Sequence, residues 1–387
     1  MVKAIKVMLI PNNVQKTKMF QYAGASRFAY NWALAREKEN YEKGGKFISD
    51  SELRKEFTKL RHSDEYAWLL NISNNVTKQA IKDACTAYKN FFRGLQKFPR
   101  FKSKKRAMPK FYQDNVKIQF SNTHVKFEGF SSSRKANKQK MNWVRLAEHG
   151  RIPIDANYMN PRISFDGLNW WISVCVEFPD CKETLNDDGV GIDLGIKDLA
   201  VCSDAVKYKN INKSQKVKKL EKQKRRLQRS ISRSYEKNKK GESYCKTNHV
   251  IKKEKLLLKR NHRLTNIRKN YLNQTISEIV NRKPRFICIE DLNVSGMMKN
   301  RHLSKAVQEQ GFFWFRKQLE YKCSDKGIQL IVADRFYPSS KLCSCCGNIK
   351  KDLKLSDRVY RCECGNMIDR DFQASINLKA YGERFAS

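Results

Sequence analysis

Residues 189–195 read Gly-Val-Gly-Ile-Asp-Leu-Gly, and residues 197–202 read Lys-Asp-Leu-Ala-Val-Cys. Both runs are short, nearly all apolar and separated by a tight turn, which is typical of buried strands. Asp193 is the exception, because acids are uncommon inside apolar strands. The stretch therefore predicts two consecutive strands, with a functional carboxylate on the first of them.

The chain after residue 204 alternates between helices and strands. Basic helices are expected near 214–233 and 250–281, a buried strand at 285–290, a helix at about 304–325, a strand at 328–332 and a helix-like tail at 371–381. Strands that alternate with helices indicate an α/β domain. Glu290 ends the buried strand, and Asp371 stands at the start of the last helix.

Three acids, Asp193, Glu290 and Asp371, are expected at one edge of this sheet, because strand ends and helix starts gather there. Carboxylates so close together repel one another unless a cation joins them. Oxygen ligands suit Mg²⁺ or Mn²⁺, and two such ions about 3.5–4 Å apart would support phosphodiester hydrolysis. Each acid alone could instead be a turn, loop or cap residue, and Asp369 competes with Asp371 as the third acid.

Other catalytic signatures are missing from the sequence. It holds no His-Glu-x-x-His zinc motif, no Gly-x₄-Gly-Lys-Ser/Thr phosphate loop and no Ser nucleophile elbow. The acidic trio is therefore the strongest catalytic candidate.

Five of the twelve cysteines fall within residues 343–364. Cys343-x-x-Cys346 and Cys362-x-Cys364 are separated by fifteen residues, and a glycine follows each pair. This spacing predicts a zinc ribbon in which four thiolates bind one structural Zn²⁺, and the ion would carry the folding of so small a module. Cys345 is expected to point away, and reduced cysteines without metal are the alternative.

The N-terminal half is expected to combine helices with a small β domain. Residues 1–12 read as one strand, residues 16–95 as helices and residues 96–186 as short alternating strands. The expected strands within the last segment are 116–120, 125–127, 162–165 and 170–178. Ser49-x-x-Glu52 predicts a capping box and Asp166-Gly167 a hairpin turn. The N-terminal strand could belong to the β domain, with the helices as an insertion.

Charge predicts the class of partner. Lys and Arg number 79 against 39 Asp and Glu, a net charge of +40. Such a chain repels itself unless a polyanion neutralises it, and phosphate contacts release counterions. We therefore expect a nucleic-acid partner, the alternative being a merely basic surface. No apolar run is long enough for a bilayer and no signal-peptide pattern opens the chain, so we expect a cytoplasmic protein without a membrane partner.

Several motifs together resemble TnpB, a protein family of insertion sequences related to type V CRISPR effectors. The specific ones are Gly191-Ile-Asp-Leu-Gly-Ile-Lys197, Ile289-Glu-Asp-Leu-Asn293, Tyr337-Pro-Ser-Ser-Lys-Leu-Cys-Ser-Cys-Cys-Gly347 and Asp369-Arg-Asp371. Less specific motifs are Tyr30-Asn31, Gln79-Ala80, Phe91-Phe92 and Pro99-Arg-Phe-Lys-Ser-Lys104. The resemblance covers nearly the whole chain.

The resemblance implies an α/β (RuvC/RNase H-like) nuclease with an embedded zinc ribbon, preceded by a β-barrel wedge domain that carries an inserted helical recognition domain. The implied boundaries are 1–14 for the first wedge strand, 15–95 for the recognition domain, 96–186 for the wedge barrel, 187–337 and 367–387 for the nuclease, and 338–366 for the ribbon. Asp193, Glu290 and Asp371 match the three RuvC acids. Asp371 is preferred over Asp369 because the family's third acid precedes x-Asn-Ala; here Gln373 replaces that Asn.

The resemblance also implies an activity. The family binds a transposon-end guide RNA (ωRNA) and cuts matching double-stranded DNA beside a short transposon-adjacent motif; single-stranded DNA is a further expected partner, and a monomer is favoured. Lys78 and Gln79, on a helix at 74–92, are candidate readers of base edges. The other candidate contacts, from a stretch that interleaves aromatic and basic residues, are Arg93, Phe98, Arg100 and Lys102. A solvated helix face and aromatics tucked into the core are the alternatives.

Three other functions would explain part of the sequence. A TnpB-like repressor would occupy DNA without cutting, but such relatives lose the acids that are present here. An RNA-binding zinc-ribbon protein acting on the transposon's transcript would leave the acids unused. An RNase H-fold transposase shares the chemistry, but the embedded ribbon and the N-terminal recognition helices favour TnpB.

Overall fold

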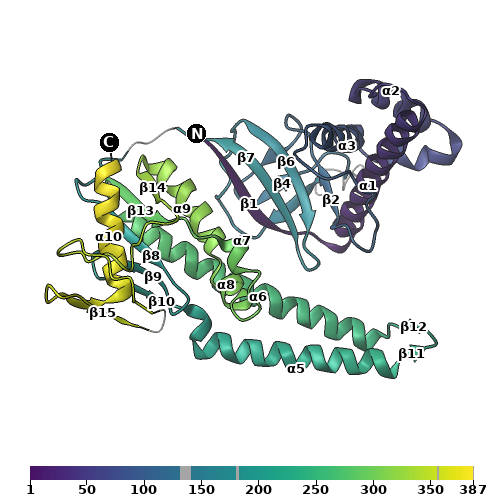
Figure 1. Cartoon of the computed structure of the whole chain (residues 1–387). Coiled ribbons are helices and arrows are strands. Elements are labelled where there is room, and N and C mark those ends of the chain that lie inside the picture. The colour runs from purple at the N-terminus through teal and green to yellow at the C-terminus, as the bar shows by residue number, and fades with distance from the viewer. Residues whose placement is uncertain (131–140, 180–182, 355–356, 387) are drawn as a thin grey trace. The chain divides into compact units, whose positions relative to one another are not determined.

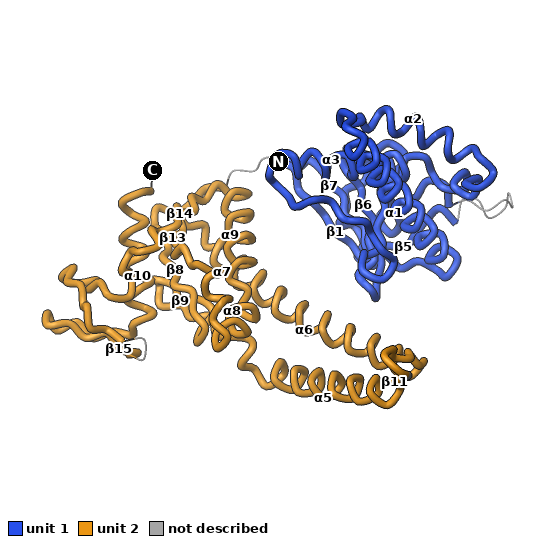
Figure 2. The backbone as a smooth tube through the Cα atoms, turned by 45° about the vertical axis from the view of Figure 1, so that its right-hand side comes forward, with its two compact units in different colours: residues 1–179 blue, residues 180–387 orange. Residues whose placement is uncertain are grey.

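The structure is a computed structural model that describes residues 1–130, 141–179, 183–354 and 357–386. The chain divides into two compact units, residues 1–179 and residues 180–387 (Figure 2). Each unit has its own hydrophobic core. Parts of the expected β domain (131–140 and 180–182) and of the expected ribbon (355–356) lie outside the described residues. No helix in the described part of the chain is both long enough and apolar enough to cross a bilayer.

The first unit is built on a seven-stranded sheet with the order β2-β6-β7-β1-β5-β4-β3, whose neighbouring strands run antiparallel. Its strands are β1 (Val2–Ile10), β2 (Lys110–Tyr112), β3 (Gln119–Phe120), β4 (His124–Lys126), β5 (Trp143–Leu146), β6 (Tyr158–Phe165) and β7 (Trp170–Glu177). Central β1 pairs with β7 and β5, so the N-terminal strand joins the β domain and the helical block is inserted after it.

The helical block consists of α1 (Asn13–Glu42), α2 (Asp50–Leu60), a 3₁₀ helix (Asp64–Asn71) and α3 (Asn74–Phe92). The predicted capping box is confirmed at the start of α2: the Ser49 hydroxyl accepts a hydrogen bond from the Glu52 amide at 3.2 Å, and the Glu52 carboxylate accepts one from the Ser49 amide at 2.9 Å. These reciprocal bonds satisfy amides that have no partner inside the helix.

The strand expected at 116–120 is wrong in its first half. Residues 115–117 form a turn, because the Asp114 carboxylate accepts hydrogen bonds from the amides of Val116 and Lys117 at 3.0 and 3.2 Å. Val116 is 88% exposed, so its alternation with polar neighbours did not mark a buried face. The predicted hairpin at Asp166-Gly167 is confirmed, with Gly167 at φ +94° between β6 and β7.

The second unit holds a five-stranded sheet with the order β10-β9-β8-β13-β14. Its strands are β8 (Val190–Leu194), β9 (Asp198–Cys202), β10 (Lys207–Lys209), β13 (Phe286–Glu290) and β14 (Gln329–Ala333). The first three form an antiparallel meander, whereas β13 runs parallel to both β8 and β14. The predicted buried strands are confirmed, and β10 is an addition to them.

Helices cover this sheet, and two of them extend beyond it. α5 (Gln215–Lys237) and α6 (Asn248–Asn281) run side by side (Figure 1). The short strands β11 (Lys239–Lys240) and β12 (Ser243–Tyr244) join their ends. The other α-helices of the described second unit are α7 (Val294–Met297), α8 (Ser304–Gln310), α9 (Phe312–Lys326) and α10 (Arg370–Phe385), and a short 3₁₀ helix (Ile211–Lys213) precedes α5. The single helix expected at 304–325 is wrong: Gly311, at φ +71°, breaks it into α8 and α9.

A glycine on β8 lets α10 lie directly against the sheet. A Cβ at Gly191 would stand 2.1 Å from the carbonyl oxygen of Ser375 and 2.4 Å from the amide nitrogen of Lys379. Gly382, one turn further along α10, packs in the same way over Phe286. Only residues without a side chain permit so close an approach, and this contact fixes where α10 begins relative to β8.

Candidate active site

Strand register places Asp193 beside Glu290. β8 and β13 are parallel, and Ile192 pairs with Ile289, so the two acids occupy the next positions along adjacent strands. Side chains alternate across a strand, so Asp193 shares the face of Gly191, which lies against α10. Glu290 likewise shares the face of Cys288, whose Cβ lies near Gly382 of α10.

The same contact brings Asp371 to the two strand acids. Gly191 lies against Ser375, and Asp371 is one helical turn nearer the start of α10. Two residues along a strand advance about 6.6 Å, and one helical turn about 5.4 Å, so Asp193 reaches the level of Asp371. Segments that lie far apart in the sequence thus bring three carboxylates to one edge of the sheet.

The pKa values of Asp193 and Glu290 are shifted at this edge of the sheet. Burial raises the pKa of Asp193 well above its ordinary value, and the charges of Glu290 and Asp371 raise it further, against a smaller opposing effect of Arg370. Burial also raises the pKa of Glu290, although the hydrogen bond from Ser339 and the charge of Arg370 oppose the change. A divalent cation at this edge would relieve the repulsion and favour the ionised forms of the carboxylates.

Asp369 and Asp371 have different environments. Asp369 caps α10: its Oδ1 accepts hydrogen bonds from the amides of Asp371 and Phe372, both at 3.1 Å, and its Oδ2 lies 3.3 Å from the Lys207 ammonium. Burial alone would raise the pKa of Asp369, but the Phe372 amide and Lys207 hold it below its ordinary value. Both Asp369 oxygens are therefore engaged in capping and pairing, which favours Asp371 as the acid left for a cation.

Four cysteine sulfurs form a second cluster, within the segment between β14 and α10. The Cys343 and Cys364 sulfurs lie 3.7 Å apart and those of Cys346 and Cys362 3.6 Å apart, and all four lie within 4.8 Å of one another. Sulfurs at about 2.3 Å from a tetrahedral Zn²⁺ would be about 3.8 Å apart, so the group fits the ion as it stands. Cys345 is exposed and outside the group, as expected. In the described part of the chain, no group of three or more carboxylates is as tight as this one.

Turns shape both halves of the cysteine cluster. Gly347, at φ +74°, and Gly365, at φ +87°, take the left-handed conformation that the predicted knuckles require. The rest of the module contains a bridge between Leu342 and Ile349 and the strands β15 (Val359–Arg361) and β16 (Met367–Asp369). It has few apolar contacts of its own, with Tyr360 its main buried side chain.

Three family models match the chain. Residues 173–301 match the IS605 OrfB model, described as a probable transposase; residues 1–46 match a helix-turn-helix domain of the same proteins; and residues 312–378 match the Cas12f1-like TNB domain. InsQ of Escherichia coli strain K12, named as a candidate RNA-guided DNA endonuclease, is 29% identical over 98% of this chain and 92% of its own length. A similarly named protein of Streptomyces pristinaespiralis is 28% identical over 98% of this chain and 89% of its own.

The matched models and relatives are those of the TnpB family, to which this chain is similar. A solved Cas12f1 complex with sgRNA and target DNA shares the fold, with a TM-score of 0.58 at 12% identity and 98% coverage of both chains. Although residues 1–46 match a helix-turn-helix model, they form a strand and one continuous helix, β1 and α1.

Sequence reasoning missed two groups at the acidic edge. Ser339 is buried, and its hydroxyl donates a hydrogen bond to Glu290. Lys207, at the start of β10, pairs with Asp369. Ser339 lies in the family motif that begins at Tyr337, which was the available signal. Nothing local marks Lys207, because its partner lies in another part of the sequence.

The candidate nucleic-acid contacts all lie in the first unit. Lys78, Arg93 and Arg100 are exposed. The Gln79 amide donates to the Asp83 carboxylate at 2.9 Å, so part of its hydrogen-bonding capacity is already engaged. Phe98 is 48% exposed and also contacts the rings of Tyr88 and Phe91, at centroid distances of 5.6 and 5.2 Å, so it serves packing and remains accessible. Lys102 is half-buried and lines a pocket.

Proposed function

We propose that this chain is an RNA-guided DNA endonuclease that cuts matching DNA with the carboxylates of Asp193, Glu290 and Asp371. One observation carries the proposal: the register of β8 against β13, together with the contact of Gly191 with α10, puts these three acids at one edge of a sheet. Similarity to RNA-guided endonucleases and a net charge of +40 support the proposed polyanionic partners, which are a transposon-end guide RNA and double- and single-stranded DNA.

The proposed architecture follows the sheet topology. The second unit is a RuvC-like (RNase H-type) nuclease over 187–337 and 367–387, supported by its antiparallel meander with two parallel strands added beyond β8. A zinc ribbon over 338–366 interrupts it, and Cys343, Cys346, Cys362 and Cys364 hold one structural Zn²⁺. The first unit is a wedge barrel, 1–14 and 96–186, with a helical recognition domain inserted at 15–95.

The proposed chemistry assigns each residue a task. Two Mg²⁺ or Mn²⁺ ions, when bound, supply an activated water and stabilise the leaving oxygen of the phosphodiester. Burial raises the pKa of Asp193 and of Glu290, so each binds a proton more tightly than an exposed carboxyl does, and a bound cation would favour the ionised forms. Ser339 orients Glu290 by donating a hydrogen bond to it. Asp369 fixes the first turn of α10 and thereby aims Asp371.

The first unit holds nucleic acid in this proposal. Exposed Lys78, Arg93 and Arg100 are placed to contact phosphates or bases, and Phe98 offers an accessible ring for stacking. Gln79 and Lys102 complete the proposed set. The active species is proposed to be a monomer carrying one guide RNA.

The test uses the purified full-length chain. RNA that copurifies is sequenced, DNA matching its guide segment is prepared, and cleavage is followed with and without Mg²⁺. Asp193→Ala and Glu290→Ala are expected to abolish cleavage while binding of RNA and DNA persists; Glu236→Gln, at an exposed position of α5, is the control that cuts normally. Full cutting by either alanine variant, or cutting that does not depend on the guide, would refute the assignment.

A further inference from the structure

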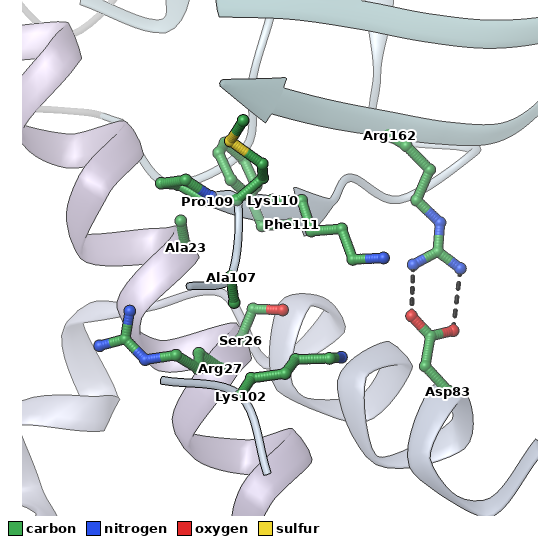
Figure 3. A pocket seen from close by; sticks show the side chains of 11 residues that line it. Ala23, Ser26, Arg27, Asp83, Lys102, Ala107, Pro109, Lys110, Phe111 and Arg162 are labelled. Atoms are coloured by element: carbon green, nitrogen blue, oxygen red, sulfur yellow. Dashed lines mark hydrogen bonds and ion pairs between the residues drawn. The ribbon is translucent and has the colours of Figure 1, made fainter. Parts of the chain in front are cut away.

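A small basic pocket lies in the first unit, whereas the three acids belong to the second unit. Residues of α1, α3, β6 and the segment leading into β2 line it (Figure 3). Arg162 of β6 makes a two-pronged ion pair with Asp83 of α3, at 2.6 and 2.9 Å. Figure 3 shows Lys102 and Lys110 extending toward this pair, the Ser26 hydroxyl pointing the same way, and Arg27 turned away.

The charges of the pocket do not balance. Asp83 is the one acid among its lining residues, and Arg162 already takes both of its oxygens. Neither Lys102 nor Lys110 forms an ion pair with a carboxylate of the described residues. Two lysine charges therefore remain uncompensated, and an anion of one or two charges would balance them.

Contacts with Tyr30 and Asn31 hold Lys102 in place. Its backbone amide donates to the Asn31 side chain at 2.8 Å, and its carbonyl accepts from the same side chain at 2.9 Å. Its ammonium lies 2.9 Å from the centre of the Tyr30 ring. Burial, and then the charge of Lys110, lowers the pKa of Lys102 to about 7. The pocket thus holds a partly desolvated ammonium that has no carboxylate partner among the described residues, and a bound anion would stabilise its charged form.

Size limits what can enter. The cavity has a volume of about 20 Å³, which is room for one water-sized group. A free nucleotide is far larger, whereas one non-bridging oxygen of a phosphodiester is of this size. Lys110 lines the cavity and is also exposed, so its ammonium is accessible to the part of the phosphate group that would remain outside.

We propose that this pocket binds a single backbone phosphate of nucleic acid, between Lys102 and Lys110, and fixes the register of that strand on the first unit. The inference rests on the proposed function, because it assumes a nucleic-acid partner. A phosphate contact positions a strand without reading its sequence. Asp83 and Arg162 would shape the site, and the hydroxyl of Ser26 would donate to the phosphate oxygen.

The experiment is phosphate ethylation interference on the full-length protein. Guide RNA, target DNA strand and non-target DNA strand are each ethylated at about one phosphate per molecule in separate arms, and complexes that still form are isolated. The wild-type protein should show interference at discrete phosphates, and one position, or two adjacent positions, in one arm should depend on this pocket. The arm identifies whether the phosphate comes from RNA or DNA.

Matched variants tie that position to the pocket. Lys102→Met with Lys110→Met should weaken binding by about 10- to 100-fold, as loss of charged hydrogen bonds predicts, and should erase the interference at that position alone. Lys104→Met with Lys105→Met removes the same charge from exposed positions of the same segment and should leave the interference intact. Lys102→Arg, which keeps the charge, should retain it, and unchanged thermal unfolding shows that each variant folds.

Two results would contradict the proposal that this pocket binds a phosphate. One is interference spread evenly over many phosphates of the wild-type complex, and the other is an unchanged interference pattern in the double methionine variant. In either case the wild-type complex would still cut guide-matched DNA, so the proposed function would survive. Loss of guided cutting by the wild type would instead refute the function itself.

Discussion

The side chain of Gln373 in α10 accepts a hydrogen bond from the hydroxyl of Ser344, between the first two cluster cysteines, at 2.9 Å. The same oxygen lies 3.3 Å from the Asn366 amide, which also donates to the Cys343 sulfur, and the Gln373 amide donates to the Leu342 carbonyl at 2.6 Å. Gln373 is fully buried and follows Asp371 by two residues. The cysteine cluster and the third acid are therefore joined through one side chain.

Gln373→Ala should slow DNA cleavage more than it weakens binding of RNA or DNA. The variant removes the hydrogen bonds that Gln373 makes with Ser344, Asn366 and the Leu342 carbonyl, each worth about 0.5–1.5 kcal/mol, and frees the first turn of α10. Single-turnover cleavage rates and equilibrium binding are the measurements.

Gln373→Asn supplies the amide with a shorter side chain, and should recover only part of the rate because it cannot reach both sides of the contact. Glu383→Gln, at an exposed position of α10, is the control and should cut normally. Equal losses in binding and cleavage would contradict a role in placing Asp371.

Removal of zinc should slow cleavage, because the cysteine module contacts α10 through Gln373. The purified protein is expected to contain about one Zn²⁺ per chain by elemental analysis. Cys346→Ser should lower that content and, since the module has little apolar core, unfold it locally. Cleavage should fall while guide RNA stays bound. Cys345→Ser, outside the cluster, should change neither value; a zinc-free wild type that folds and cuts normally would rule out the structural ion.

Signals that lie close together in the sequence could be predicted, and contacts across the chain could not. The apolar strand around Asp193, the capping box at Ser49 and the paired cysteines are local patterns with a direct physical cause. The hydrogen bond from Ser339 to Glu290 spans 49 residues, and neither partner signals the other. The break at Gly311 was missed because a strongly apolar run follows it and resembles a continuing helix.

Gly191→Ala should destabilise the second unit and abolish cleavage. A methyl group there would stand 2.1 Å from the Ser375 carbonyl oxygen, so α10 must move away from β8. Overpacking of this kind costs typically about 1–3 kcal/mol, and it displaces Asp371 from Asp193. Urea unfolding and cleavage assays are the measurements. Gly24→Ala, in α1 with nothing within 4 Å of its added methyl, is the control and should be neutral or slightly stabilising.

Asp193→Asn should stabilise the metal-free protein near neutral pH while it abolishes cleavage. Because burial and neighbouring acids raise the pKa of Asp193 in the folded state, the folded protein binds this proton more tightly than the unfolded chain does. The stability that this proton contributes is therefore present at low pH, and it is lost as the pH rises from the ordinary Asp pKa, about 4, toward the raised value. Asparagine stays neutral throughout, so the variant's melting temperature should fall less between pH 4 and pH 8 than that of the wild type.

Added Mg²⁺ or Mn²⁺ should raise the melting temperature of the wild type increasingly with pH and leave the variant nearly unchanged, because only ionised carboxylates bind the cation well. Melting curves over this range, with and without the cation, make the comparison; a variant less stable than the wild type at pH 8 without metal would mean that Asp193 serves the fold and not the cation.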